Sequence, residues 1–168
     1  MMNIKLEYIT FQTSMGWVGI LASEKGLLAA TLPRPSAEAA RRELGDDAQQ
    51  AVWSPNRLAE LAERLKAYFS GEKVEFPDEL DFSMSTLFQC DVWRQTRLIP
   101  YGETRSYQWV AEQIKKPGAA RAVGQALGKN PFLVIVPCHR VVASDGGLGG
   151  FGGGLEMKRQ LLMMEAGA

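Results

Sequence analysis

A polar, proline-containing segment divides this chain of 168 residues into two halves with different patterns. The segment is GEKVEFPDELDFSMS at residues 71–85, and linkers between domains commonly have this composition. Strand-like runs open the part before it and two helical stretches follow them, whereas helical spacing dominates after it. We therefore expect an N-terminal α/β domain at residues 1–85 and a C-terminal domain at residues 86–168.

The first half has the pattern of an antiparallel sheet with helices. Short apolar runs separated by turn residues such as SEKG predict strands at residues 3–13, 17–22 and 27–32. Serine residues then begin two stretches with helical spacing, each ended by a glycine. The predicted helices cover residues 36–44 and 54–70.

The second half has the pattern of a helix pair. A first helix is predicted at residues 86–98, and Ser106 then caps a helix through residue 114. A tight turn, KKPG at 115–118, leads into a helix at 119–130. Two short helices joined in this way form a helix-turn-helix pattern, which many proteins that do not bind DNA also contain.

The second helix of this pair has an unusual outer face. Arg121, Gly124, Gln125 and Gly128 share it, and each glycine costs the helix about 1 kcal/mol relative to alanine. One explanation is that a DNA groove approaches the backbone here, with Arg121 and Gln125 as polar probes. The other is helix–helix packing, and both stay open. The opposite, core-facing side carries Ala119, Ala122, Val123, Ala126 and Leu127.

The stretch FLVIVPCHRVV, residues 132–142, contains the only histidine of the chain and one of its two cysteines. The apolar run LVIV is typical of a buried strand, which Pro137 ends just before Cys138. A cysteine reacts as the thiolate, and histidine is the usual base that generates it. A lone Cys-His pair also has a structural explanation, as a buried cysteine beside a hydrogen-bonded histidine.

Direct contact between Cys138 and His139 is not expected, because adjacent residues of an extended chain point to opposite faces. A bridging water is the easier link between the thiol and the ring. The ring then needs a third group to orient it. Glu156 and Glu165 on the predicted terminal helix are the candidates.

A glycine-rich segment, SDGGLGGFGGG at 144–154, follows the cysteine. GLGGFG matches the G-x-G-x-x-G spacing of dinucleotide-binding loops. Only 16 residues follow Gly152, however, and these are too few for a further βαβ unit. No G-K-[ST] sequence follows it, so a nucleotide-phosphate loop is also excluded. The segment is better explained as a loop that lets a ligand approach its backbone.

The composition is typical of a soluble globular protein, and we expect a cytoplasmic one without a membrane span or a signal peptide. Cys90, Cys138 and one histidine cannot form a C-x-x-C zinc site, and a disulfide is not expected in a reducing compartment. Cys90 is interpreted as a small apolar residue on a helix.

Charge is distributed unevenly along the chain. Residues 1–85 carry nine basic and thirteen acidic side chains, whereas residues 86–168 carry ten and six. This asymmetry indicates a nucleic-acid surface on the second half, although a difference of this size also arises by chance.

Three segments of the second half closely resemble the O6-alkylguanine-DNA alkyltransferases. They are PCHRV, the helix pair SYQWVAEQI…AARAVGQALGKNP, and GGFGGGLEMKRQLLMMEAG. The match is dense over residues 86–168, whereas the first half fits in layout only. The resemblance implies an α+β fold: an N-terminal sheet with helices in a ribonuclease H-like layout, and a C-terminal helical domain with a winged-helix-like helix-turn-helix.

The resemblance also implies a reaction. Such proteins rotate an O6-alkylated guanine out of double-stranded DNA, and a cysteine takes the alkyl group irreversibly, once per molecule. By this match Cys138 is the acceptor, and His139 is its base through a water. Glu165, rather than Glu156, occupies the position that orients the ring. Asn130 anchors the turn before the active-site segment.

The DNA contacts follow from the same match. Arg121 is expected to enter the minor groove and fill the gap left by the base, and Tyr107 to press on the target phosphate. No cofactor, metal or obligate protein partner is implied, and O4-alkylthymine is an open further substrate. The remaining residues implied at the DNA surface are Ser106, Gly124 and Gln125, and those implied at the guanine pocket are Pro137, Val141, Phe151, Gly152 and Gly153.

Three departures from the family pattern bear on this expectation. Some members have Tyr-Ser where this chain has Phe151-Gly152, so base contacts there must come from backbone amides or water. Some hold zinc in the N-terminal domain, but no cysteine or histidine precedes Cys90 here. Cys138 is present, whereas the related alkyltransferase-like proteins, which bind lesions without repairing them, lack this residue.

Two other functions stay open at this stage. One is a module that binds alkylated DNA and recruits a partner without transfer. The other is a cysteine hydrolase, which would need an oxyanion hole and turnover.

Overall fold

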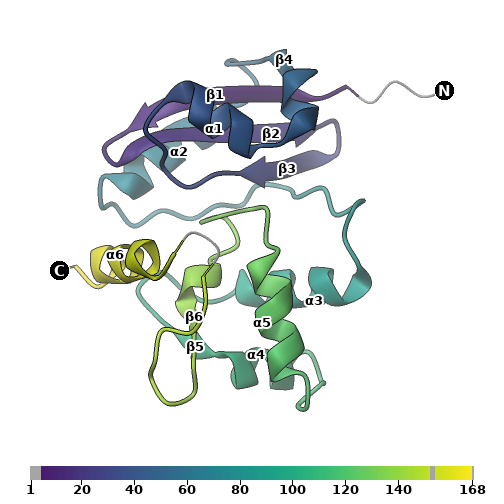
Figure 1. Cartoon of the computed structure of the whole chain (residues 1–168), viewed down its shortest axis with the longest axis vertical. Helices are drawn as coiled ribbons and strands as arrows, with labels where there is room; N and C mark the ends of the chain where they lie inside the picture. Colours follow the sequence, from purple (N-terminus) through teal and green to yellow (C-terminus); the bar gives the residue numbers. More distant parts are fainter. Residues whose placement is uncertain (1–4, 152–153, 168) are drawn as a thin grey trace. The chain divides into compact units, whose positions relative to one another are not determined.

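The computed structural model describes residues 5–151 and 154–167 (Figure 1). The chain forms two compact units, and each is described by itself. The first comprises Met1–Ser83 together with Pro131–Leu133, and the second comprises Met84–Asn130 and Val134–Ala168. Among the described residues, no helix is long and apolar enough to cross a membrane.

The first unit contains a four-stranded sheet in the order β3-β2-β1-β4. The three antiparallel strands agree with the sequence prediction, whereas β4 pairs in parallel with β1 and was not predicted. Two residues are too few to show a period, and both β4 side chains are about half exposed. The strands are β1 (Glu7–Thr13), β2 (Gly16–Ser23), β3 (Gly26–Ala30) and β4 (Val52–Trp53).

Two α-helices and a short 3-10 helix complete this unit: α1 (Ala37–Glu43), η1 (Asp46–Gln49) and α2 (Ala59–Phe69). The predicted cap of α1 is confirmed, because the Ser36 hydroxyl accepts a hydrogen bond from the amide of Ala39. The predicted start of the second helix at residue 54 is wrong. The Ser54 amide donates to the Tyr8 carbonyl at 3.0 Å, so the chain still runs beside β1 there, and residues 55–58 form a turn before α2 begins.

The apolar run after Asn130 is not the buried strand that was predicted. Residues 131–133 add to β3, since the Ala30 amide donates to the Pro131 carbonyl and the Leu133 amide donates back to Ala30. The chain then turns at Val134, which has a positive φ of 73°. The run is buried, but burial of an apolar segment does not require a strand, and the turn ends any ladder before the cysteine.

The second unit is mainly helical. The predicted helix pair is present as α4 and α5, and the Ser106 hydroxyl caps α4 by accepting from the Trp109 amide at 2.9 Å. The Trp93 indole donates to the Ala126 carbonyl at 3.0 Å, which fixes α3 against α5. The elements are α3 (Leu87–Thr96), β5 (Arg105–Ser106), α4 (Tyr107–Gln113), α5 (Ala120–Gly128), η2 (Cys138–Arg140), β6 (Val141–Val142) and α6 (Leu155–Glu165).

Candidate active site

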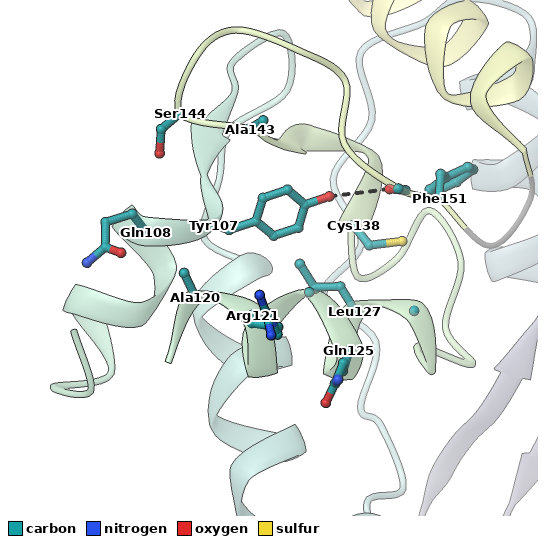
Figure 2. A pocket seen from close by; sticks show the side chains of 13 residues that line it. Tyr107, Gln108, Ala120, Arg121, Gln125, Leu127, Cys138, Ala143, Ser144 and Phe151 are labelled. Carbon is teal, nitrogen blue, oxygen red and sulfur yellow. Dashed lines mark hydrogen bonds between the residues drawn. The ribbon is translucent and has the colours of Figure 1, made fainter. Parts of the chain in front are cut away.

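A pocket of about 610 Å³ opens in the second unit, and Cys138 is among the residues that line it (Figure 2). Helices α4 and α5 form two of its sides, and the glycine-rich segment forms another. The lining residues are Tyr107, Gln108, Ala120, Arg121, Gly124, Gln125, Leu127, Gly128, Cys138, Ala143, Ser144, Gly150 and Phe151.

Cys138 begins the short helix η2 immediately after Pro137. Its side chain is buried, and burial raises the pKa of its thiol. A hydrogen bond with Asn130, the charge of Lys158 and nearby backbone amides oppose this effect without overcoming it. The resting thiol is therefore protonated at neutral pH, and a reaction at sulfur requires a path for the proton.

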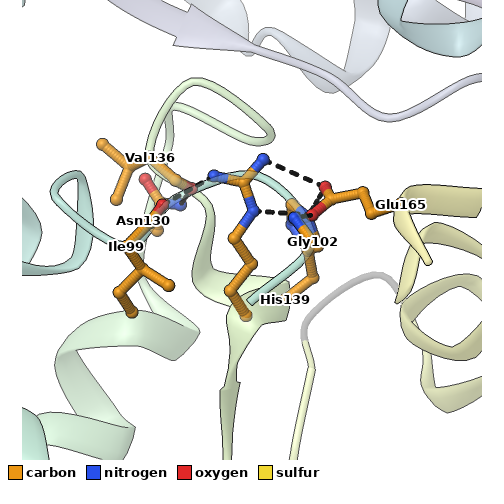
Figure 3. Close-up of polar contacts among 7 residues, drawn as sticks. Ile99, Gly102, Asn130, Val136, His139 and Glu165 are labelled. Carbon is orange, nitrogen blue, oxygen red and sulfur yellow. Dashed lines mark hydrogen bonds and ion pairs between the residues drawn. The ribbon is translucent and has the colours of Figure 1, made fainter. Parts of the chain in front are cut away.

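His139 is fully buried, and its Nε2 lies 2.6 Å from Glu165 Oε2 (Figure 3). Burial lowers the pKa of His139, with the hydrogen bond to Glu165 acting in the opposite direction. The imidazole is therefore neutral near pH 7. A carboxylate can only accept at Nε2, so this nitrogen carries the proton and Nδ1 is left as the basic nitrogen.

Glu165 is held in place by three further hydrogen bonds. Arg140 donates through Nε to Oε1 at 2.7 Å and through an NH2 nitrogen to Oε2 at 3.1 Å, and the Gly102 amide donates to Oε1 at 3.1 Å. The structure thus brings Glu165 to His139. Glu156, the other candidate, forms an exposed pair with Arg159.

Arg140 is a member of this cluster that the sequence analysis missed. It is buried, and its second terminal nitrogen donates to the Ile99 carbonyl at 2.8 Å. The available signal was an arginine in the otherwise apolar segment after the histidine, since a buried arginine needs a partner.

Lys158 on α6 was also missed. Its side chain has no exposed surface, and Nζ donates to the Val141 carbonyl at 2.6 Å and the Gly150 carbonyl at 3.1 Å. Burial lowers its pKa from 10.5 to about 8. No sequence pattern predicted its burial, because a lysine beside Arg159 is typical of the exposed face of a helix.

Asn130 lies where the sequence placed it, at the turn before the cysteine segment. Its side chain is buried, and Nδ2 donates to the Val136 carbonyl at 3.0 Å. Since Asn130 also hydrogen-bonds Cys138, one side-chain amide joins the end of α5 to Cys138 and to the backbone leading into it.

Four of the five residues predicted at the DNA surface line the pocket. Arg121, Gln125 and Gly124 line it from α5, and Tyr107 lines it from α4. A Cβ on Gly124 would lie 3.7 Å from the Tyr107 ring, and one on Gly128 would meet nothing within 4 Å. The glycines are therefore not required for helix–helix packing, which removes that explanation.

Three other predicted residues are not among the described residues that line the pocket: Ser106, Pro137 and Val141. The Ser106 hydroxyl instead caps α4. Phe151 does line it, whereas Gly152 and Gly153 lie outside the described residues. Within ranges 5–151 and 154–167, no group of three or more cysteine, histidine or acidic residues could hold a metal ion.

Comparison with known proteins identifies the family of the chain. The family model described as 6-O-methylguanine DNA methyltransferase, DNA binding domain, matches residues 87–167. A methylated-DNA–protein-cysteine methyltransferase of Mycolicibacterium paratuberculosis is 55% identical over 112 residues, which is 67% of either chain.

Solved structures extend the similarity to both units. The crystal structure of Mycobacterium tuberculosis O6-methylguanine methyltransferase has a TM-score of 0.79 and 40% identity, covering 96% of this chain and 93% of that one. A structure of M. tuberculosis OGT in complex with DNA has a TM-score of 0.79 and 41% identity with the same coverage. The chain therefore belongs to the methylated-DNA–protein-cysteine methyltransferase family of DNA-binding repair enzymes, which confirms the family that its motifs indicated.

Proposed function

We propose that this chain repairs double-stranded DNA by transferring the O6-alkyl group of guanine irreversibly to its own Cys138, once per molecule. The observation that carries this proposal is the position of Cys138 in the lining of a pocket, next to a buried histidine held by a carboxylate. The pocket volume of about 610 Å³ admits a purine rotated out of the duplex. O4-alkylthymine is a further substrate to be tested.

The proton leaves the thiol before or during attack. A water carries it from Cys138 to Nδ1 of His139, while Nε2 keeps its proton and its bond to Glu165. The thiolate then attacks the alkyl carbon in line, an S–C bond forms, and the C–O6 bond breaks. The Tyr107 hydroxyl or a loop amide supplies the proton or hydrogen bond that the leaving guanine needs.

None of these reaction steps restores the thiol, because a histidine does not hydrolyse a thioether at neutral pH. One molecule therefore repairs one base. A cysteine hydrolase would instead release its product and turn over, so stoichiometry separates these two functions.

DNA binds across the outer face of α5 in this proposal. Arg121 and Gln125 are exposed on that face, and Gly124 and Gly128 leave room for the backbone to approach a groove. Arg121 fills the space of the rotated base, and Tyr107 presses on its phosphate. Helices α4 and α5 act as the helix-turn-helix of a winged-helix-like domain at residues 86–168.

The remaining assignments rest on the family resemblance. Residues 1–85 form a supporting domain with a ribonuclease H-like layout, and the protein works in the cytoplasm. Ser106 contributes to the DNA surface as the cap of α4. Phe151 forms part of the wall of the guanine pocket. Pro137 and Val141 are assigned to this pocket by the resemblance alone.

The test is the intact mass of the protein after incubation with duplex DNA containing O6-methylguanine, followed by peptide mapping. One methyl group per protein on Cys138, with plain guanine left in the DNA, is the expected result. Cys138→Ala should gain no mass, and Cys90→Ala should behave as the wild type. Tight binding without a mass change would instead place the protein among lesion-binding modules.

A further inference from the structure

Gln125 is an exposed side chain of α5 to which the proposed reaction gives no chemical role. It lines the same pocket as Cys138, and in the part of the chain that the structure describes its amide has no hydrogen-bond partner. Gln108, which also lines the pocket, donates instead to the Pro117 carbonyl at 2.8 Å and so holds the turn before α5. Gln125 therefore presents both ends of its amide, a donor and an acceptor, to whatever approaches α5.

Gln125 lies one helical turn after Arg121. Four residues rotate by about 400° and rise by about 6 Å, so the two side chains leave nearly the same face of α5. Both are exposed and both line the pocket (Figure 2). In the proposed complex Arg121 takes the space of the rotated base, and bases of one strand are about 3.4 Å apart. The side chain of Gln125 is therefore one or two base pairs away from the lesion.

The surface around Gln125 indicates which groove of the DNA it enters. A Cβ on Gly128 would meet nothing within 4 Å, and one on Gly124 would meet only the Tyr107 ring, at 3.7 Å. The minor groove is about 6 Å wide, so a helix of about 10–12 Å diameter approaches its floor only along a face without side chains. The major groove is about 12 Å wide and accepts a helix with its side chains. The two glycines therefore favour the minor groove.

The base edges in a minor groove match the two ends of a glutamine amide. Every base pair offers acceptors there, N3 of a purine and O2 of a pyrimidine, whereas only G·C pairs add a donor, the 2-amino group of guanine. Gln125 can donate through Nε2 to guanine N3 and accept through Oε1 from the 2-amino group. An A·T pair at the same place leaves Oε1 without a donor.

We infer that Gln125 is a specificity-determining residue, which reads a G·C pair beside the lesion through the 2-amino group of guanine and makes repair fastest in that sequence context. This role rests on the proposed function, because it concerns the DNA of that same reaction. The expected discrimination is about tenfold, which corresponds to about 1.4 kcal/mol and lies within the usual range for a bidentate contact to a base.

The decisive experiment removes one amino group from the DNA and one amide from the protein. Duplexes containing O6-methylguanine carry a G·C pair at each of the two nearest positions on either side of the lesion. Inosine then replaces guanine at one position at a time, which removes only the 2-amino group. Single-turnover repair rates at limiting protein are measured for the wild type and for Gln125→Leu. The matched control is Gln113→Leu, which changes an exposed glutamine at the other end of α4 from Tyr107.

A reciprocal set of duplexes adds the amino group instead. An A·T pair is compared with 2,6-diaminopurine·T, which has the minor-groove donor of a G·C pair on an adenine-like base. The amino group also strengthens base pairing, and this affects how easily the neighbouring base rotates. Gln125→Leu supplies the baseline for that effect on every duplex, because it meets the same DNA without the amide.

At one of the four positions, the ratio of the G·C rate to the inosine·C rate should be about tenfold higher for the wild type than for Gln125→Leu. Gln113→Leu should follow the wild type, and 2,6-diaminopurine·T should exceed A·T by a similar factor at the same position. Equal ratios for the wild type and Gln125→Leu at all four positions would overturn the inference. A response to 7-deazaguanine in place of inosine would also overturn it, since N7 lies in the major groove.

Binding measurements separate this inference from the proposed function. The Kd of each duplex is measured by fluorescence anisotropy in a Cys138→Ala background, with and without Gln125→Leu. If the protein with Cys138 transfers no methyl group, the proposed function fails, whereas the dependence of Kd on the 2-amino group still tests Gln125. If transfer is normal and neither rate nor Kd depends on that group through Gln125, the inference alone fails.

Discussion

His139 and Glu165, which lie 26 residues apart in the sequence, share a hydrogen bond of 2.6 Å, and both side chains are buried. The bond fixes which ring nitrogen carries the proton, and it joins the segment after Cys138 to the last helix. Arg140 binds both oxygens of the same carboxylate, so its cation balances the buried negative charge. The cluster therefore unites the three parts that the proposed mechanism uses: a basic ring nitrogen, the carboxylate that orients the ring and the cation that balances that carboxylate.

Glu165→Gln should slow alkyl transfer strongly without a large change in shape. The amide is close in size to the carboxylate, but it no longer stabilises the positive charge that develops on His139. The rate of transfer from free O6-benzylguanine should fall on the order of 100-fold or more, by analogy with other carboxylate–histidine pairs. Glu156→Gln, on the exposed side of α6, is the control and should react as the wild type.

Arg140→Met should lower the free energy of unfolding much more than the removal of an exposed arginine does. It leaves the carboxylate of Glu165 buried without its counter-ion, which typically costs about 3–5 kcal/mol. Arg159→Met removes an exposed pair and should cost less than about 1 kcal/mol. Urea denaturation of the two variants measures both free energies of unfolding, and equal losses would show that Arg140 does not balance Glu165.

The free energy of unfolding should decrease as the pH falls through 6.5, the ordinary pKa of histidine. Burial lowers the pKa of His139 in the folded protein, so below this pH the unfolded chain binds a proton that the folded chain does not bind. The stabilisation is therefore present above pH 6.5 and is lost on acidification. Urea denaturation on either side of this pH measures the effect.

The loss of stability below pH 6.5 can be assigned to one residue, because His139 is the only histidine of the chain. His139→Gln should remove most of the pH dependence between neutrality and the range in which carboxylates begin to titrate. A variant that keeps the full dependence would show that another group is responsible.

The sequence predicted best where local chemistry decides the structure. The serine caps of α1 and α4 and the helix pair depend on side-chain type and spacing, and the structure places them as expected. The choice of Glu165 over Glu156 as the partner of His139 came instead from the family resemblance, and the structure brings Glu165 to the ring. The pattern of apolar residues led to wrong predictions at residues 54 and 134. The Ser54 amide donates to the Tyr8 carbonyl of strand β1, and the apolar run turns at Val134. Neither feature changes the spacing of apolar residues in the sequence.

Arg140 and Lys158 show a further limit of the sequence. Both are charged residues that a pattern assigns to the surface, yet both are buried because carbonyls or a carboxylate from other elements surround them. The Ile99 carbonyl that Arg140 contacts lies 41 residues away in the sequence. The Val141 carbonyl that Lys158 contacts lies 17 residues away. Contacts at these separations become visible only in the folded structure.

Arg121→Ala should impair repair of duplex DNA more than attack on free O6-benzylguanine. The side chain is exposed on α5 at the rim of the pocket, where it would contact DNA rather than the thiol. Loss of one such contact typically costs about 1–3 kcal/mol of binding or transition-state free energy on DNA. Single-turnover rates on the two substrates measure the difference, and equal losses would remove α5 from the DNA interface.

Gly149→Ala should disrupt the pocket through a single steric contact. Gly149 has a φ of +71°, and a Cβ there would lie 2.4 Å from the Tyr107 hydroxyl and 2.7 Å from its ring. Gly146 is a matched control, because its φ of +89° imposes similar backbone strain while nothing lies within 4 Å of its Cβ position. Each alanine pays about 1–2 kcal/mol for the left-handed backbone, but only Gly149→Ala must displace Tyr107 or the loop. Transfer from O6-benzylguanine should therefore fall sharply for Gly149→Ala relative to Gly146→Ala. Equal rates in the two variants would mean that contact between the loop and Tyr107 does not shape the reactive pocket.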